Sequence, residues 1–225
     1  MCENVKRIKE TIAEHALKVG RDPQEILIVA ATKTFGVDAI KEAISCGITA
    51  IGENRVQELM EKYPHLKGQV DFHFIGHLQT NKVKYIIDKV KLVHSLDREK
   101  LAEEIDKRAK QKGIIMDCLI EVNIGGEDTK FGISPEEMHN LVKKLEKYDN
   151  IKIKGLMTIA PYLPPEEVRP YFKRMRELFE DLKRINQRNV EAQYLSMGMS
   201  NDYWVAVEEG ANIVRIGTAI FGERR

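Results

Sequence analysis

The sequence contains few of the residues that cross-link small secreted domains. It has three cysteines, Cys2, Cys46 and Cys118, in 225 residues, and none of them forms a CxxC pair. An odd number of scattered cysteines is typical of free thiols in a reducing compartment. We therefore expect no structural disulfide, and the sequence predicts a cytoplasmic protein.

Long apolar runs and an excess of one charge are also missing. There is no stretch of about twenty apolar residues, and the N-terminus is charged where a signal peptide would be apolar. Lysine plus arginine number 36 against 35 acidic residues, a formal charge of +1. This balance provides no field to hold a nucleic acid or an anionic membrane, so we expect neither as a partner. Any anion must be bound locally.

Short apolar runs alternate with amphipathic helical patterns along the whole chain. Strands are predicted over residues 26–34, 48–51, 72–75, 90–94, 114–122, 151–159, 194–197 and 213–216. A helical pattern follows each of the first seven runs, and another, over residues 3–19, precedes the first. Eight such units in about 200 residues predict an α/β fold, a single (β/α)8 barrel domain over residues 1–225 with an extra N-terminal helix.

The first apolar run ends in a lysine. Residues 26–34 read Ile-Leu-Ile-Val-Ala-Ala-Thr-Lys-Thr, which is typical of a strand buried on both faces. Side chains alternate along a strand, so Lys33 shares a side with Val29 and Ala31 and is expected at the mouth of the barrel. Partial burial there disfavours the ammonium form and would make Lys33 a nucleophile. The alternative is an ordinary exposed lysine.

Small turns that contain glycine follow the seventh and eighth predicted strands. Residues 196–202 read Ser-Met-Gly-Met-Ser-Asn-Asp, and residues 215–218 read Arg-Ile-Gly-Thr. Glycines let the backbone approach an anion, and (β/α)8 barrels commonly bind phosphate at these two places. Each turn alone could be purely structural. Because the eighth strand closes on the first, Lys33 would face this phosphate site, and pyridoxal 5'-phosphate (PLP) requires such an arrangement.

Five motifs resemble one known family, in the same order along the chain. They are Ala30-Ala31-Thr32-Lys33, Ile51-Gly52-Glu53-Asn54, Phe74-Ile75-Gly76-His77-Leu78-Gln79-Thr80-Asn81-Lys82, Ser196-Met197-Gly198-Met199-Ser200 and Arg215-Ile216-Gly217-Thr218. Together they resemble the pyridoxal-phosphate homeostasis protein family, which is similar to the barrel domain of alanine racemase. The resemblance implies a fold-type III barrel that holds PLP covalently on Lys33 as a Schiff base. It also implies a role in intracellular PLP homeostasis, by buffering the cofactor or delivering it to PLP-dependent apoenzymes.

The resemblance also implies which residues surround the cofactor. Ser200, Gly217 and Thr218 match the family's phosphate contacts. Arg215 matches the arginine that faces the pyridine nitrogen. Asn54, His77 and Met197 fall in family motifs around the ring. An arginine beside the ring nitrogen disfavours its protonation and weakens the cofactor as an electron sink.

The expected difference from alanine racemase is the second acid/base. The racemase takes that group, a tyrosine, from a C-terminal β domain, whereas this sequence ends at Arg225 after the eighth unit. General acid/base help is worth about 10²- to 10⁴-fold, so we expect a non-catalytic cofactor carrier. Because that domain also forms the racemase dimer, we expect a monomer. A weak amino-acid racemase is the alternative, and a barrel aldolase or isomerase acting on a sugar phosphate through Lys33 is a third hypothesis.

Two further features allow simpler interpretations. His73 and His77 are four residues apart, but they span a strand end and not one helical face, and no carboxylate or thiolate completes a set, so no metal is expected. Lys130 follows a Gly-Gly loop at the expected active rim. It could approach the cofactor or lie exposed on a mobile loop, and the sequence leaves both open.

Overall fold

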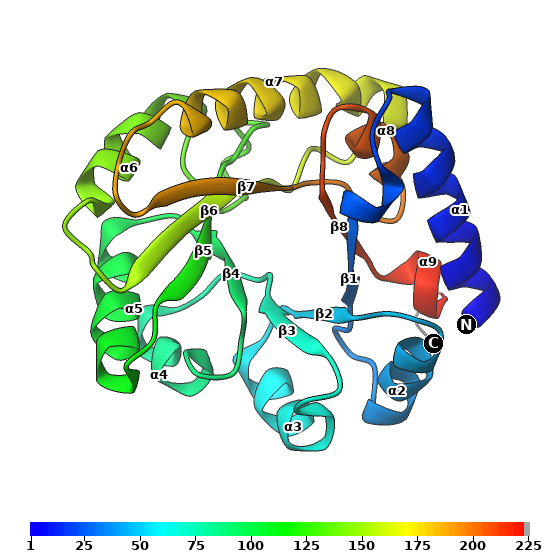
Figure 1. The fold of residues 1–225 in the computed structure, drawn as a ribbon, viewed down its shortest axis with the longest axis horizontal. Coiled ribbons are helices and arrows are strands. Elements are labelled where there is room, and N and C mark those ends of the chain that lie inside the picture. The colour runs from blue at the N-terminus through cyan, green and yellow to red at the C-terminus, as the bar shows by residue number, and fades with distance from the viewer. Residues whose placement is uncertain (223–225) are drawn as a thin grey trace.

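The computed structural model describes residues 1–222. Within them, eight parallel strands form a closed barrel in the order of the chain (Figure 1). The strands are β1 (Leu27–Ala31), β2 (Ala50–Glu53), β3 (Asp71–Phe74), β4 (Leu92–Leu96), β5 (Met116–Glu121), β6 (Ile151–Met157), β7 (Val190–Ser196) and β8 (Ile213–Ile216). The predicted (β/α)8 barrel is confirmed.

Helices cover the outside of the barrel (Figure 1). They are α1 (Cys2–Lys18), α2 (Val37–Ser45), α3 (Val56–Leu66), α4 (Val83–Ile86), α5 (Glu99–Lys112), α6 (Met138–Leu145), α7 (Pro165–Lys183), α8 (Tyr203–Glu208) and α9 (Thr218–Phe221), with the 3-10 turns η1 (Pro23–Glu25), η2 (Thr80–Lys82) and η3 (Pro135–Glu137). The predicted N-terminal helix is α1, which packs against α8 and α9. None of the helices in the described part of the chain has the length and apolar character needed to cross a bilayer.

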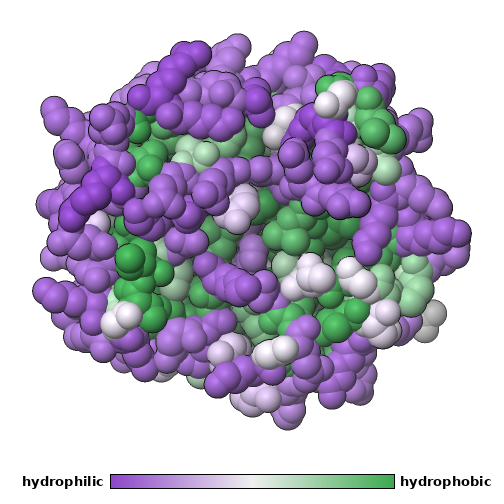
Figure 2. Space-filling model, in the orientation of Figure 1, coloured by the Kyte–Doolittle hydropathy of each residue, from purple (hydrophilic) through white to green (hydrophobic). Residues whose placement is uncertain are grey.

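The core has two layers, which follow from the alternation of side chains along each strand. Val29 of β1 belongs to a small cluster inside the barrel, whereas Ile28 and Ala30 pack in the large cluster between strands and helices. Leu27 and Ala31 pack against the inner cluster, as predicted for the side that leads to Lys33. Figure 2 shows hydrophobic residues gathered at the middle of the molecule inside a hydrophilic rim.

The barrel closes where β1 pairs with β8. The two strands are parallel, and Val29 lies opposite Arg215 while Ala30 lies opposite Ile216. A Cβ atom added to Gly217 would lie 3.4 Å from the carbonyl oxygen of Ala31, so the two strand ends are in contact. The carboxyl ends of β1 and β8 therefore open at the same end of the barrel, called the mouth below.

Four predicted strands, the first, fifth, sixth and seventh, differ in length from those observed. The first was expected over residues 26–34, but β1 ends at Ala31 and residues 33–34 form a turn. The seventh was expected from residue 194, but β7 begins at Val190. At the start of β7, apolar residues alternate with the polar Glu191 and Gln193. Glu191 pairs with Lys152 and Lys154 of β6 at 2.6 and 2.7 Å. Ile153 and Val190 pack in the large cluster between strands and helices, so these charged side chains point to the opposite, inner face of the sheet. A strand start with charged residues on its inner face gives little apolar signal in the sequence.

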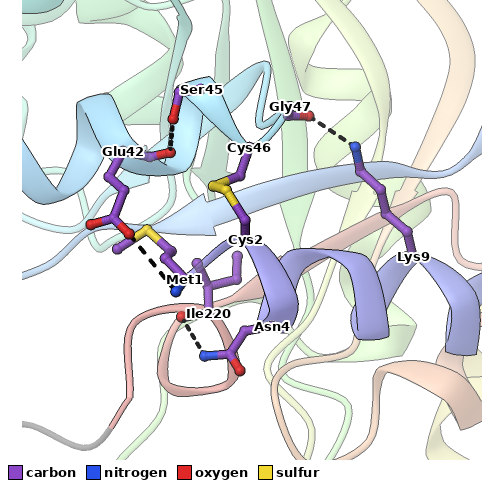
Figure 3. Close-up of a disulfide and its surroundings, with 9 residues drawn as sticks. All are labelled: Met1, Cys2, Asn4, Lys9, Glu42, Ser45, Cys46, Gly47 and Ile220. Carbon is purple, nitrogen blue, oxygen red and sulfur yellow. Dashed lines mark hydrogen bonds and ion pairs between the residues drawn. A yellow bond between two sulfur atoms is a disulfide. The ribbon is translucent and has the colours of Figure 1, made fainter.

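The expectation that all three cysteines are free is wrong. Cys2 at the start of α1 and Cys46 directly after α2 form a disulfide (Figure 3). Cys118 is free and buried in β5. The two half-cystines are 44 residues apart, and only the packing of α1 beside α2 brings them together. Only one of the three cysteines is therefore a free thiol, so the cysteines support a reducing compartment less than expected.

We predict that the disulfide stabilises the fold. Closing a loop of 44 residues restricts the unfolded chain and contributes about 2 to 4 kcal/mol. Reductant should lower the free energy of unfolding by this amount, as measured by urea denaturation. The variant Cys2→Ser should be equally destabilised and should no longer respond to reductant. An untreated protein that unfolds at the same urea concentration as the reduced one contradicts the prediction.

Candidate functional site

Lys33 lies in a turn at the mouth of the barrel, directly after β1. Lys33 is half-buried, and its amine forms no hydrogen bond or ion pair with the residues that the structure describes. The neighbouring Thr32 is fully buried. Thr34 has φ 71°, a backbone conformation uncommon for residues other than glycine. The turn is thus strongly constrained, while the amine that it carries is available.

The turns after β7 and β8 contact one another at the same mouth. The Ser200 hydroxyl accepts a hydrogen bond from the Ala219 N–H at 3.2 Å, which joins the first turn to α9. Gly198 has φ 93°, and a Cβ atom there would lie 2.6 Å from that of Ala206, so only glycine fits. Gly217 precedes α9 and Thr218 begins it, with an exposed side chain. Ser200, Gly217 and Thr218 therefore lie in adjoining segments, as the sequence predicted.

Arg215 points into the barrel below these turns. It is 4% exposed, and burial lowers its pKa to about 10, so the guanidinium stays charged near neutral pH. Its Nη1 donates to Ser196 Oγ and its Nη2 to the Thr158 carbonyl oxygen, each at 2.7 Å. The guanidinium is thereby fixed by the end of β7 and by the residue directly after β6.

Two buried histidines support Ser196 from below. His94 Nδ1 lies 3.0 Å from Ser196 Oγ, and His94 Nε2 lies 3.0 Å from His73 Nδ1. Burial lowers the pKa of His73 to about 4 and that of His94 well below its ordinary value, so both rings are neutral at physiological pH. A neutral network adds no charge to compete with Arg215. Inward-facing polar residues in otherwise apolar strands were the signal that sequence reasoning missed.

Glu121, the last residue of β5, is a second functional candidate that sequence reasoning missed. It is 5% exposed, and its Oε2 is buried without a hydrogen-bond partner among the described residues. Burial, helped by the nearby Asp97 carboxylate, raises the pKa of Glu121 to about 7, although Arg215 and Arg98 oppose the shift. An unpaired buried carboxyl is costly and is expected where a ligand completes its hydrogen bonds.

His77 and Asn54 also lie at the mouth. The His77 ring stacks on Phe131, with centroids 3.8 Å apart, and its Nδ1 is 3.7 Å from Asp97 Oδ2. Burial lowers the pKa of His77 despite this carboxylate. Asn54 follows β2, and a Cβ atom on Gly76 would lie 2.3 Å from the Asn54 carbonyl oxygen. Glycine at that position lets the turns after β2 and β3 pack together.

Met197 and Lys130 are placed differently from the other predicted residues. The Met197 side chain is fully buried in the core cluster between the strands and the helices. Its contact with the ring stays a prediction. Lys130 donates to Glu127 Oε1 at 2.6 Å and to the Ala160 carbonyl oxygen at 3.0 Å. It therefore fastens the loop after β5 to the segment after β6.

The closed parallel barrel, with a free amine after β1 and small turns after β7 and β8, defines the class of barrel found in alanine racemases. A family model described as "Alanine racemase, N-terminal domain" matches residues 3–225. Within this class, the chain belongs to the pyridoxal phosphate homeostasis protein family, to which many of its relatives are assigned by name.

Three comparisons illustrate this relationship. The pyridoxal phosphate homeostasis protein of Aquifex aeolicus is 51% identical over 226 residues, covering 100% of this chain and 98% of its own. The structure of PipY from Synechococcus elongatus with PLP bound is 31% identical, with a TM-score of 0.81, covering 94% of this chain and 100% of PipY. An alanine racemase of Clostridium difficile shares the fold at 17% identity and a TM-score of 0.70, covering 99% of this chain and 57% of the racemase.

We predict that Glu121 makes stability depend on pH. Its pKa is raised from 4.5 to about 7, so between these values the unfolded chain loses a proton that the folded protein keeps. The free energy of unfolding should therefore fall as the pH rises through this window. Glu121→Gln does not titrate, so it should remove the fall and be more stable than the parent by about 3 kcal/mol at about pH 8.

The measurement is urea denaturation of the ligand-free protein and the variant across this pH range. Glu14→Gln is the matched control, because Glu14 is exposed on α1 and its side chain forms no hydrogen bond or ion pair with the residues that the structure describes. Parallel pH dependence of the parent and Glu121→Gln would show that the carboxyl titrates normally.

Proposed function

We propose that this protein binds PLP, with the Lys33 amine forming a Schiff base with the cofactor aldehyde. The observation that carries the proposal is the position of Lys33. Its amine has no internal partner among the described residues, and it lies at the mouth that contains Ser200, Gly217 and Thr218. The PLP-bound structure of PipY supports the proposal, because its similarity to this protein extends over 94% of this chain.

The residues at the mouth fit such a cofactor. The Ser200 and Thr218 hydroxyls and the backbone around Gly217 are suited to a phosphate group. Arg215 would face the ring nitrogen, and its partners Ser196 and the Thr158 carbonyl leave its charge in place. When bound, the cofactor supplies an aldehyde that reacts with amines.

We propose that the function is PLP homeostasis, by buffering the cofactor or delivering it to PLP-dependent apoenzymes, and not catalysis. Arg215 stays charged near neutral pH, and beside the ring nitrogen it would disfavour protonation of that atom and weaken the cofactor as an electron sink. The names of the relatives support the homeostasis role. The monomeric state and the cytoplasmic location stay predictions.

A weak amino-acid racemase is the second candidate, and Glu121 is the observation that favours it. A carboxyl with a pKa of about 7 can accept and return a proton near neutral pH, as general acid/base chemistry requires. Its Oε2 has no partner among the described residues that would hold it in one protonation state.

We predict that Lys33 carries the cofactor. The purified protein mixed with PLP should show a near-visible absorbance band that survives dialysis, and borohydride should fix a pyridoxyl group on Lys33, located by mass spectrometry of peptides. Lys33→Ala should lose both signals, because it lacks the amine. Lys130→Ala should keep them, since Lys130 is engaged in its own loop. A reduced adduct on another lysine would refute the proposed site.

We predict that the loaded protein leaves the α-proton of alanine or serine in place. The test is prolonged incubation in deuterated water, followed by proton NMR of the amino acid. Sustained exchange in the parent that Glu121→Gln abolishes would establish the racemase alternative. Exchange equal to that of free PLP would support the carrier function.

A further inference from the structure

A buried lysine, Lys62 of α3, lies behind the turn that carries Lys33. It is 6% exposed, which is rare for lysine unless its charge is paired. Its Nζ donates to the Thr32 carbonyl oxygen at 2.8 Å, to Glu53 Oε1 at 2.7 Å and to Glu58 Oε2 at 3.3 Å. One ammonium group thus joins the turn to a carboxylate from β2 and another from α3.

The two carboxylates hold the residues on either side of Lys33. Glu53, which is fully buried, accepts a hydrogen bond from the Thr32 hydroxyl at 2.5 Å as well as from Lys62. Glu58 Oε2 accepts from the Thr34 N–H at 2.8 Å. Lys62, Glu53 and Glu58, the Lys62 cluster, therefore fasten the backbone immediately before and after Lys33.

The backbone at Thr34 needs this support. Thr34 has φ 71°, and no other residue besides glycine has a positive φ within residues 1–222. A β-branched residue in this conformation is strained, and such strain persists only where the surroundings impose it. The hydrogen bond from Thr34 to Glu58 lies at the strained residue itself.

The charges of the cluster depend on Lys62. Burial raises the pKa of Glu53, while hydrogen bonds from Lys62 and Thr32 oppose the shift. Burial acts in the same direction on Glu58, but the Thr34 N–H and Lys62 outweigh it, so its pKa is lowered. Without Lys62, two carboxylates would lie close together with no cation between them, and at least one would be protonated or move.

We propose that Lys62 is a positioning residue for Lys33, because the Lys62 cluster fixes the turn at residues 32–34 and thereby directs the Lys33 amine into the mouth. The part that concerns the cofactor rests on the proposed function, whereas the effect on the geometry of the turn does not. Within the described residues, the hydrogen bonds of Lys62 go to Thr32, Glu53 and Glu58, and none goes to Lys33 or to Arg215.

The test compares Lys62→Met with the parent. Methionine keeps much of the apolar stem but removes the cation and its three hydrogen bonds. Lys67→Met is the matched control, because Lys67 lies at the end of the same helix with an exposed side chain. Lys62→Arg keeps a cation and hydrogen-bond donors at the site, and it tests for rescue.

Two measurements are made on each protein. The first uses the cofactor-free protein: the acetylation rate of Lys33 by limiting acetic anhydride, followed by peptide mass spectrometry over a range of pH. The second is the dissociation constant for PLP from the absorbance titration. In Lys62→Met we expect a changed pH profile of Lys33 acetylation and an affinity for PLP about tenfold weaker, since a misdirected amine loses about one hydrogen bond's worth of interaction. Lys62→Arg should retain more affinity than Lys62→Met, and Lys67→Met should match the parent.

Each result decides the proposal. A folded Lys62→Met with the parent's acetylation profile and PLP affinity overturns it. If the parent itself takes up no PLP on Lys33, the proposed function fails, but the acetylation profile still tests the positioning role. If Lys62→Met does not fold, Glu58→Met replaces it, since this removes the acceptor for Thr34, one contact to Lys62 and an ion pair with the exposed side chain of Arg55. An unchanged acetylation profile in that variant also overturns the proposal.

Discussion

The pairing of β1 with β8 is the interaction on which the rest of this structure depends. Val29 lies opposite Arg215 in this pair, and the register places the turn after β1 beside the turn after β8. Residues near the two ends of the sequence thereby come to share one small volume. A one-residue change in that register would turn the inward-facing side chains of β1 outward, because successive residues of a strand point to opposite faces. Lys33 would then no longer lie beside the turn after β8.

Buried charge is concentrated around this mouth and is handled in different ways. Arg215 is held by neutral partners, Ser196 and the Thr158 carbonyl, so its charge remains unbalanced by a direct carboxylate contact. Lys62 is instead paired with two carboxylates and serves the backbone. Glu121 Oε2 has no hydrogen-bond partner within residues 1–222. Desolvation makes each of these buried charged groups costly to the folded state. We therefore expect these groups to serve ligand binding and not stability.

Contacts near the disulfide connect the start of the chain to α9. Besides Cys2 and Cys46, the Asn4 side chain donates to the Ile220 carbonyl oxygen of α9 at 3.0 Å (Figure 3). The aromatic ring of Phe221 in α9 stacks on Phe35, which follows Lys33 by two residues, with centroids 4.4 Å apart. The N-terminal helix therefore braces the short α9 that follows Gly217.

The sequence by itself determined the barrel, the inward side of β1 and the position of Lys33 at its end, because apolar periodicity and glycine-containing turns are local signals. It also indicated the turns around Ser200 and Gly217. Only the tertiary structure decided the pairing of Cys2 with Cys46 and the contacts of Ser196, Glu121 and Lys62. Those contacts join elements far apart in the chain, and a polar residue inside an apolar pattern reveals its partner only when the barrel has closed.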